Sequence, residues 1–439
     1  MNTDEIIQNA QKVLEENRRG DYTVPAGSLY PHQWLWDSCF IAIGLSHYDS
    51  ERAQKEILSL LRGQWANGML PHMIFSSGIS HRQDREVWRS YVSPLAPDNV
   101  ATSGITQPPL LAEAIVRIGK KLKAPERRSW YRRVYQPLLA YHQWLYNERD
   151  PHGEGLTLQI HPWETGLDNT PSWMYEMHQH QLGPWIRIVE KLHLDTVVTL
   201  FRKDTYFSMP GERLSNIDAL GLYSTQRRLR RKQYDIQRIL SHSLFAIEDL
   251  VFNSIFIRAN THLKSIAKTL GEELPEDLQE RMRKNEKSLE QMWDGYSGQY
   301  YPRNFVTHKL IKVPTIATFL PLYAGCISKE RAEQLISLMT TSRRFNPKYP
   351  VPTVPTDSEY FDEHRYWQGP TWVNMNWLII DGLKRYGQDE LAEKIASKTV
   401  ELVQKHGFHE YFSPIDGSPA GVDNFSWTAA LTIDLLNQK

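Results

Sequence analysis

Apolar side chains recur at spacings of three and four along most of the chain, a pattern typical of amphipathic α-helices. Segments that alternate apolar and polar residues, as half-buried strands do, are few. The pattern therefore predicts an all-α protein, with helices over residues 3–17, 33–47, 50–63, 107–122, 126–147, 172–200, 215–222, 230–243, 246–270, 275–293, 314–324, 329–342, 371–386, 389–406 and 425–437.

The connections between these helices are alternately short and long, and the long ones hold most of the proline, glycine and tryptophan. Long loops in a compact domain usually carry function. Since no Ser/Gly linker and no fixed-period repeat is visible, we predict one domain over residues 1–439 and disfavour a solenoid. A toroid of helical hairpins suits these connections, with loop insertions at about 64–106, 201–214 and 343–370 forming a cap over a pocket.

Composition adds mainly exclusions. The 51 basic and 51 acidic side chains cancel, so no overall charge attracts nucleic acid or an anionic membrane. No apolar run approaches the roughly 20 residues that cross a bilayer. Two cysteines and an N-terminus without a signal-peptide core predict a cytoplasmic protein. The 14 tryptophans and 21 tyrosines exceed ordinary core needs, so some rings should line a surface.

The segment HPWETGLDNTPSW, residues 161–173, combines acids with aromatic rings. Trp163 offers a flat apolar face next to Glu164 and Asp168. Burial beside an indole can raise the pKa of a carboxyl group, as a general acid near neutral pH requires. From this loop alone, the interpretation that Asp168 and Asn169 merely cap the following helix is equally open.

The segment SLYPHQWLWDSCF, residues 28–40, places Tyr30, Trp34, Trp36 and Asp37 at the entry to a helix. Such a group can bind a sugar, because rings stack on its C–H face while the acid accepts hydroxyl protons. A helix start with buried tryptophans and an early-turn acid would explain the same residues. Both interpretations stay open at this point.

Two further segments complete the set of candidates. RYWQGPTWVNMNW, residues 365–377, supplies aromatic faces and amides just before a helix, and GFHEYFSPIDGSPAGVDNFSWTAAL, residues 407–431, holds Glu410 before a loop rich in Gly, Pro and Asp. Glu410 and Asp168 are far apart in the sequence, so only a closed fold could bring them together. A toroid would do so.

In order and across essentially the whole chain, YPHQWLWDSCF, HPWETGLDNTPSW, RYWQGPTWVNMNW and HEYFSPIDGSPAGVDNFSWTAAL resemble glycoside hydrolase family 63, particularly its small single-domain bacterial members. EDLVFNSIF, residues 248–256, is similar to a further segment of that family. The resemblance implies an (α/α)6 toroid and hydrolysis of α-glycosidic bonds with inversion at the anomeric carbon.

The resemblance also implies roles for individual residues. Asp168 matches the general acid and Glu410 the general base, and inversion needs the two carboxyl groups roughly 6.5–9.5 Å apart so that a water fits. Neither a metal nor another cofactor is required. In addition to Tyr30, the motifs imply eight positions at the sugar site: Trp34, Trp36, Asp37, Gln107, Trp163, Tyr366, Trp367 and Gln368.

The expected substrate is a small soluble α-glycoside, glucosylglycerate or mannosylglycerate. Glycerate-processing members of the family carry an arginine-rich segment after the helix that follows the acid. The segment here, residues 197–216, matches it only partly but retains Arg202, Lys203 and Arg213, which would face the acceptor carboxylate.

Two alternatives remain open at this stage. The same fold could act on a neutral disaccharide such as trehalose, sucrose or a glucobiose, or it could bind carbohydrate without catalysis. The second alternative predicts the loss of one acid, and both acids are present.

The basic run RRLRRKQ, residues 227–233, is interpreted as a solvated face at the start of a helix. The predicted partner is thus a small glycoside, with no nucleic acid and no membrane, and a homo-oligomer is compatible with the sequence.

Overall fold

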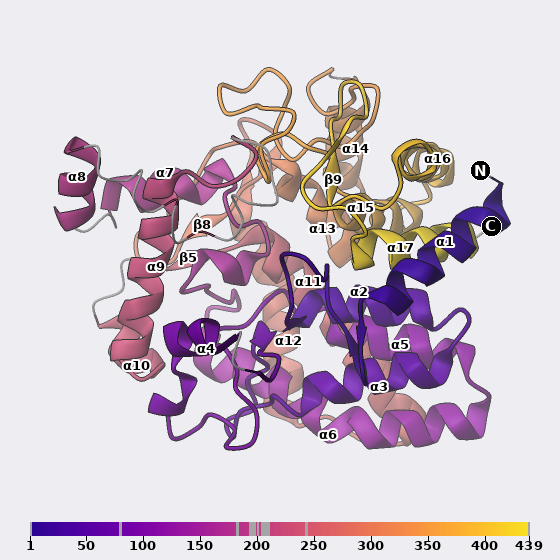
Figure 1. The fold of residues 1–439 in the computed structure, drawn as a ribbon, viewed down its shortest axis with the longest axis horizontal. Helices are drawn as coiled ribbons and strands as arrows, with labels where there is room; N and C mark the ends of the chain where they lie inside the picture. Colours follow the sequence, from indigo (N-terminus) through magenta and orange to yellow (C-terminus); the bar gives the residue numbers. More distant parts are fainter. Residues whose placement is uncertain are drawn as a thin grey trace.

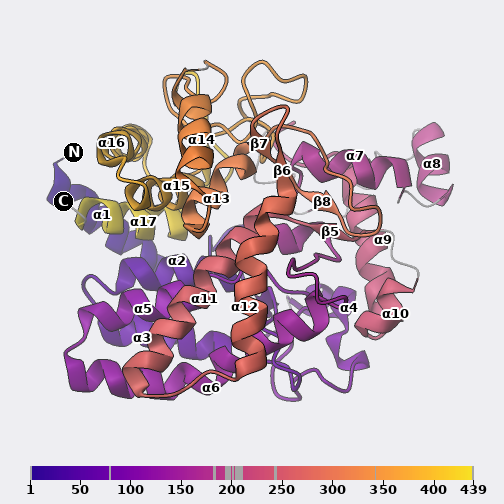
Figure 2. The same ribbon diagram turned by 180° about the vertical axis from the view of Figure 1, so that it is seen from behind.

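The computed structural model describes residues 2–78, 81–180, 184–192, 199, 202, 211–241, 245–341 and 343–437 (Figures 1 and 2). Six inner helices form a closed ring in which each helix packs on the next and the last packs on the first. In ring order they are α2 (Leu35–Leu45), α5 (Leu111–Lys121), α11 (Leu250–Leu270), α13 (Leu320–Ala324), α15 (Val373–Arg385) and α17 (Ser426–Asn437).

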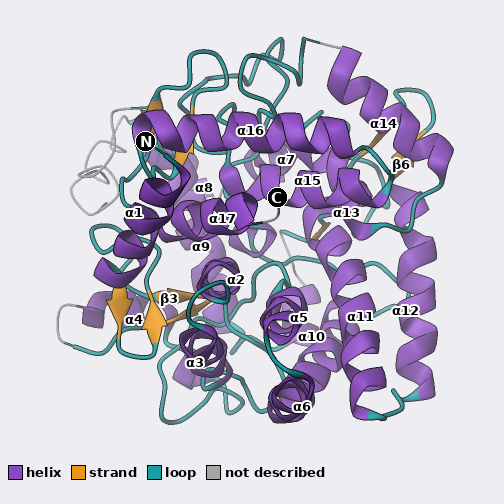
Figure 3. Cartoon of the chain, turned by 90° about the vertical axis from the view of Figure 1, so that its right-hand side faces the viewer, coloured by secondary structure: helices purple, strands orange, loops and turns teal. Residues whose placement is uncertain are grey.

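Six outer helices surround this ring, as Figure 3 shows. They are α1 (Thr3–Glu16), α3 (Ser50–Leu61), α6 (Ala124–Arg149), α12 (Glu276–Ser288), α14 (Lys329–Thr341) and α16 (Asp389–His406). Inner and outer helices alternate along the chain. The predicted (α/α)6 toroid is therefore confirmed.

The connections explain where a site can form. Each inner helix before α17 is followed by a short turn, whereas each outer helix is followed by a longer segment: residues 17–34, 62–110, 150–249, 289–319, 342–372 and 407–425. All the long segments therefore lead into the N-terminal ends of inner helices, which meet at one end of the ring. The predicted alternation of short and long connections is confirmed.

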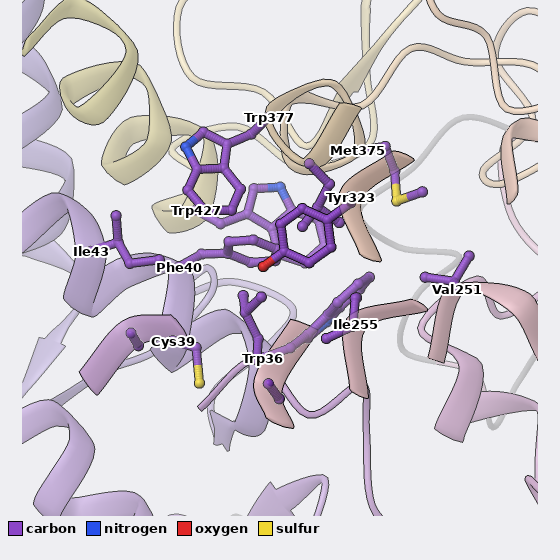
Figure 4. Packing of buried hydrophobic residues seen from close by; sticks show 14 of the residues in the cluster. Trp36, Cys39, Phe40, Ile43, Val251, Ile255, Tyr323, Met375, Trp377 and Trp427 are labelled. Carbon is purple, nitrogen blue, oxygen red and sulfur yellow. The ribbon is translucent and has the colours of Figure 1, made fainter. Parts of the chain in front are cut away.

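Helix α2 shows why the inner ring is buried. Its sequence, LWDSCFIAIGL, is apolar around most of its circumference, and every residue in it is buried, as expected for a helix in the interior of a large domain. The ring of Phe40 meets those of Trp377 and Trp427 edge-on, with centroids 5.9 and 6.0 Å away (Figure 4). A Cβ added to Gly44 would lie 2.5 Å from Cα of Ala430, so only glycine permits this approach of α2 to α17.

The strands of the described chain are pairs of two residues each, all antiparallel. One pair joins the entry of α2 to the loop after α3, with Gln33 opposite Ile74, and another forms a hairpin before α17, with Phe412 opposite Pro419. The paired strands are β1 (Arg18–Arg19) with β2 (Tyr22–Thr23), β3 (Gln33–Trp34) with β4 (Met73–Ile74), β5 (Ile247–Glu248) with β8 (Arg303–Asn304), β6 (Trp293–Asp294) with β7 (Gln299–Tyr300), and β9 (Tyr411–Phe412) with β10 (Pro419–Ala420).

Further helices lie in the long connections, outside the ring (Figures 1 and 2). They are α4 (Arg82–Trp88) after α3, and α7 (Pro171–His180), α8 (Pro184–Lys191), α9 (Asn216–Arg231) and α10 (Ile236–Leu240) between α6 and α11. Helix α4 was not predicted, because seven residues are too short for a clear period. Much of the expected insertion at 201–214, including Lys203, lies outside the described residues.

Two helix predictions were wrong in detail. One helix was predicted over 172–200, but the described part of that range forms α7 and a separate α8 that begins at Pro184. A proline cannot continue the hydrogen bonding of a preceding helix, which explains a new start there. RRLRRKQ, predicted at a helix start, instead ends α9, where positive side chains complement the helix dipole. No helix of the described chain is long and apolar enough to span a bilayer.

Candidate active site

The loop that carries Asp168 joins the 3-10 helix η3 (Pro162–Thr165) to α7. Gly166 ends η3 with φ of 77°, a left-handed conformation that favours glycine. A Cβ at this position would also lie 2.7 Å from Cη2 of Trp36, so the loop packs directly on the inner helix α2.

Glu164, the other acid of the same segment, serves the structure of the loop. Its carboxylate accepts hydrogen bonds from Nη2 of Arg149 at 2.6 Å and from the backbone N–H groups of Ile160 and Thr106 at 2.7 and 3.1 Å. Glu164 is fully buried. Its oxygens are therefore committed to holding the loop, which leaves Asp168 as the acid available to a ligand.

Asp168 lines a cavity, described below, and accepts a hydrogen bond from the hydroxyl of Tyr366 at 2.9 Å. Burial raises the pKa of Asp168 to about 7, while the Tyr366 hydrogen bond and the Arg213 charge lower it and the Glu410 charge raises it. A carboxyl group with such a pKa is substantially protonated near neutral pH. Asp168 can therefore donate a proton, as a general acid must.

We predict an alkaline fall in activity that reports Asp168. Because the acid must be protonated, kcat/KM should fall as pH rises through about 7. Tyr366→Phe removes a donor that favours the ionised form of Asp168, so the alkaline limb of the pH profile should move to higher pH. In Tyr411→Phe, the lost hydroxyl contacts the Glu212 carbonyl instead of Asp168, and the limb should stay in place. Equal shifts in both variants would contradict the role of this hydrogen bond.

The segment before α15 fastens the Asp168 loop. The backbone N–H of Trp367 donates to Oδ1 of Asn169 at 2.9 Å, and Nε2 of Gln368 donates to the carbonyl oxygen of Asn169 at 2.6 Å. The Trp367 ring stacks on that of Trp372 with centroids 3.7 Å apart. The position of Asp168 therefore depends on contacts between segments nearly 200 residues apart.

Glu410 lies at the start of the β9–β10 hairpin and is 1% exposed. Its Oε1 accepts hydrogen bonds from the hydroxyl of Tyr30 at 2.9 Å and from Nη1 of Arg213 at 3.2 Å. Its Oε2 accepts from Nη2 of Arg213 at 2.5 Å and from the N–H of Val422 at 3.2 Å. Since arginine stays protonated in proteins, this is a guanidinium–carboxylate pair.

Gly421 gives a test of how tightly the hairpin holds Glu410. A Cβ there would lie 2.5 Å from Oε2 of Glu410, and the residue has φ of +69°. We expect Gly421→Ala to displace the carboxylate and lower kcat by at least about tenfold, since a misplaced catalytic group costs activity steeply. Gly271→Ala is the matched control, because Gly271 has φ of +77° but nothing within 4 Å of an added Cβ. Equal losses of kcat in both variants would mean that backbone strain alone is responsible.

Two adjoining cavities meet at Asp168. The inner one, of about 50 Å³, is bounded by both acids and by rings from three inner-helix entries. The outer one, of about 280 Å³, contains the two arginines of the predicted acceptor segment. Tyr30, Trp34, Asp168 and Tyr366 belong to both walls. A ligand that extends from one cavity to the other would pass Asp168.

The structure brings most of the predicted site residues together. Those on the inner wall are Tyr30, Trp34, Trp36, Asp37, Gln107, Asp168, Tyr366, Trp367 and Glu410. Trp163 and Arg202 line the outer cavity instead. Gln368 lies on neither wall of these two cavities, and its side-chain amide binds the Asn169 backbone. Its contact with sugar therefore remains a prediction.

Asp37 lies close to the two candidate catalytic acids. Burial raises its pKa well above the usual range, and the charges of Glu410 and Asp168 raise it further. Beside it, Oε1 of Gln107 accepts a hydrogen bond from the N–H of Trp36 at 3.4 Å. These polar groups lie at the inner end of the site, where sugar hydroxyls could replace lost hydration.

Sequence reasoning missed two features of the site. Trp427 lines the inner cavity at the first turn of α17. A tryptophan at the entry of an inner helix, as at Trp36, was the signal that could have found it. Arg213 was expected at the acceptor, but its ion pair with Glu410 was not predicted.

One cluster in the described chain has metal-ligand geometry: His32, His81 and Asp84, with ligand atoms within 4.8 Å of one another. However, Nδ1 of His32 accepts the N–H of Ser76 at 3.2 Å. In a neutral imidazole the proton must then be on Nε2, which lies 3.2 Å from Asp84 and donates to it. A hydrogen-bonded pair explains this contact better than a metal site.

The helical toroid and its acid-bearing pocket belong to a class of enzyme, the glycoside hydrolases. Residues 30–428 match the family model described as the mannosylglycerate hydrolase MGH1-like glycoside hydrolase domain. The chain belongs to this group within glycoside hydrolase family 63, so the predicted family is confirmed.

Relatives and solved structures match over almost the full length. The chain is 38% identical to the mannosylglycerate hydrolase of Thermus thermophilus, over 97% of this chain and 99% of the relative. It is 30% identical to the glucosylglycerate hydrolase of Mycolicibacterium hassiacum, over 98% of both proteins. The crystal structure of a family 63 mannosylglycerate hydrolase from Thermus thermophilus in complex with Tris and D-glycerate superposes with a TM-score of 0.88 at 36% identity, covering 99% of this chain and 100% of that one.

Proposed function

We propose that the protein hydrolyses mannosylglycerate or glucosylglycerate to the free sugar and glycerate, with inversion at the anomeric carbon. One observation carries this proposal: Asp168 lies on the wall shared by the two cavities, while Glu410 lines the inner one. A sugar in the inner cavity and an acceptor in the outer one would place the glycosidic oxygen next to Asp168. The relatives named for these two substrates support the choice.

Asp168 would act as the general acid. Its carboxyl proton moves to the glycosidic oxygen as the bond between that oxygen and the anomeric carbon breaks, so glycerate leaves as an alcohol. The pKa of about 7, which burial produces, keeps the proton available near neutral pH.

Glu410 would act as the general base. It accepts a proton from the water whose oxygen forms the new bond to the anomeric carbon, on the face opposite to the leaving group. Water supplies the new hydroxyl of the sugar, and the two carboxyl groups return to their starting states through solvent. No redox step or further reactant is needed.

The remaining residues would bind the two halves of the substrate. Trp36, Asp37 and Gln107 face the sugar in the inner cavity, while Arg202 and Arg213 face the acceptor in the outer one. Guanidinium groups suit a carboxylate because they bind it through two parallel hydrogen bonds. The cationic outer wall disfavours the alternative of a neutral disaccharide.

We also propose that the chain is a single catalytic domain, in which the long connections cap the pocket. A cytoplasmic location fits the low cysteine content and a small soluble substrate. A homo-oligomer is compatible with this proposal, in which every residue of the mechanism comes from one copy of the chain.

The decisive experiment is NMR observation of the products of mannosylglycerate and glucosylglycerate, with trehalose and sucrose as neutral comparisons. We expect the β-anomer of the sugar to form first from at least one glycerate substrate, and much lower kcat/KM for the neutral sugars. Initial release of the α-anomer would exclude inversion. Preferential turnover of a neutral disaccharide would replace the proposed substrate.

A further inference from the structure

The ion pair between Arg213 and Glu410 joins the two cavities. Arg213 lines the outer cavity, whereas Glu410 lines the inner one. The guanidinium therefore extends from the acceptor side to the proposed base. Both side chains are nearly excluded from solvent, at 6% and 2% exposure.

In this arrangement the base is occupied. Oε1 accepts from Tyr30 and Arg213, and Oε2 accepts from Arg213 and Val422. A carboxylate offers about four lone-pair sites, and these four donors fill them. A water molecule could not donate to Glu410 without displacing one of them. Arg213 and Tyr30 both line the outer cavity, but only the guanidinium carries a charge that an anion bound there would attract.

We propose that the carboxylate of an anionic aglycone, bound in the outer cavity, takes Arg213 away from Glu410 and thereby frees the base to accept a proton from water. This inference rests on the proposed function. It makes Arg213 a specificity-determining residue, because the aglycone's charge prepares the proton acceptor on the other side of the sugar.

The aglycone needs a negative charge because Arg213 must exchange the Glu410 carboxylate for another one. Breaking a buried ion pair without a replacement leaves uncompensated charges and is strongly unfavourable. A substrate carboxylate keeps the guanidinium paired, and Glu410 keeps its bonds from Tyr30 and Val422. The Nε–H of Arg213 is buried with no acceptor among the described residues, which gives the incoming anion a further donor.

The surroundings of Arg213 allow either pairing. The guanidinium carbon lies 4.7 Å from the ring centroid of Tyr366 and 5.9 Å from those of Tyr30 and Tyr411. Aromatic faces attract a cation without fixing the direction of its hydrogen bonds. Among these three tyrosines, the one to which Arg213 also donates is Tyr30, from Nη1 to the hydroxyl at 2.8 Å. A neutral aglycone can occupy the same cavity but cannot release the base, so discrimination should affect kcat as well as binding.

Glycosyl fluorides separate the two carboxylates in an experiment. With α-mannosyl or α-glucosyl fluoride, the C–F bond breaks to release fluoride, water adds at the anomeric carbon and Glu410 accepts the proton. Fluoride is small, so the outer cavity remains open to an added anion. We expect free D-glycerate to raise kcat/KM for the fluoride by at least about tenfold, and glycerol at equal concentration to leave it unchanged.

Variants then assign the effect to Arg213. R213Q should hydrolyse the fluoride at least about tenfold faster than the unstimulated natural protein and should not respond to glycerate. R213K keeps a charge without the paired donors and should retain part of the response. R62Q removes an exposed arginine paired with Asp21 and should behave like the natural protein. Thermal denaturation of each variant reports whether it folds.

The outcomes are distinguishable. Turnover of a glycerate glycoside, together with inhibition or no effect of free glycerate on fluoride hydrolysis, would overturn the exchange and leave the proposed function standing. A slower R213Q on the fluoride would also overturn the exchange, because Arg213 would then assist the base. If R213Q fails to fold, the natural protein and R213K still decide. Failure to hydrolyse either glycerate substrate would overturn the proposed function itself.

Discussion

Asp168→Asn is expected to lower kcat on a glycerate glycoside by about 10²–10⁴-fold, the range typical of a lost general acid. An amide of the same size can still accept the Tyr366 hydrogen bond but cannot supply a proton to the leaving oxygen. The measurement is steady-state hydrolysis of mannosylglycerate and glucosylglycerate at pH 7. Folding should be preserved, because Glu164 holds the loop through its own contacts.

The leaving group distinguishes an acid from a merely structural residue. Fluoride departs without protonation, so Asp168→Asn should lose far less activity on an α-glycosyl fluoride than on the glycerate glycoside. The fluoride rate is to be compared in the presence of D-glycerate, so that the state of Arg213 is the same for both proteins. Equal losses on the two substrates would remove Asp168 from the acid role.

Glu410→Gln is expected to lower kcat by about 10²–10⁴-fold on both types of substrate, because water must lose a proton whichever group leaves. The variant should also lose stability. Arg213 would remain buried with a neutral amide, and breaking a buried pair costs about 3–5 kcal/mol, here at the low end because the amide oxygen still accepts one hydrogen bond. Denaturant unfolding measures this loss.

A double variant separates the two effects of Glu410. R213Q combined with E410Q removes the uncompensated charge, so it should recover most of the lost stability. Activity should stay as low as in E410Q alone, because the base is still missing. If E410Q alone kept near-normal activity, another group would have to activate the water.

The sequence predicted a helix accurately where its ends are marked by nearby residues, such as a regular apolar period or a capping side chain. Helices α3 and α16 matched the prediction within two residues at each end, since their apolar periods are regular and Asp49 caps the first. The boundary between α9 and α10 was misplaced. It falls at Gln233 and Tyr234, which both have positive φ, and neither glutamine nor tyrosine usually adopts that conformation.

In the candidate site, too, the sequence predicted some features and not others. Acids and tryptophans in turn-rich segments made Asp168, Glu410 and Trp36 candidates without any structure, and the resemblance to the family then implied their roles. For Gln368 the residue type left the partner undecided, since its amide equally suits a sugar hydroxyl and the Asn169 carbonyl that it binds, and its contact with sugar stays a prediction. A residue type gives the bonding capacity of a side chain but not its partner.

By itself the sequence determined an all-α chain with alternating short and long connections, the family, and the candidate acid and base. Only the tertiary structure decided that Asp168 lies between two cavities and that Arg213 is bound to Glu410, a partner 197 residues away. The physical reason is that helix formation follows local periodicity. Burial, charge pairing and the pKa of Asp168 depend instead on which distant side chains the closed ring brings into contact.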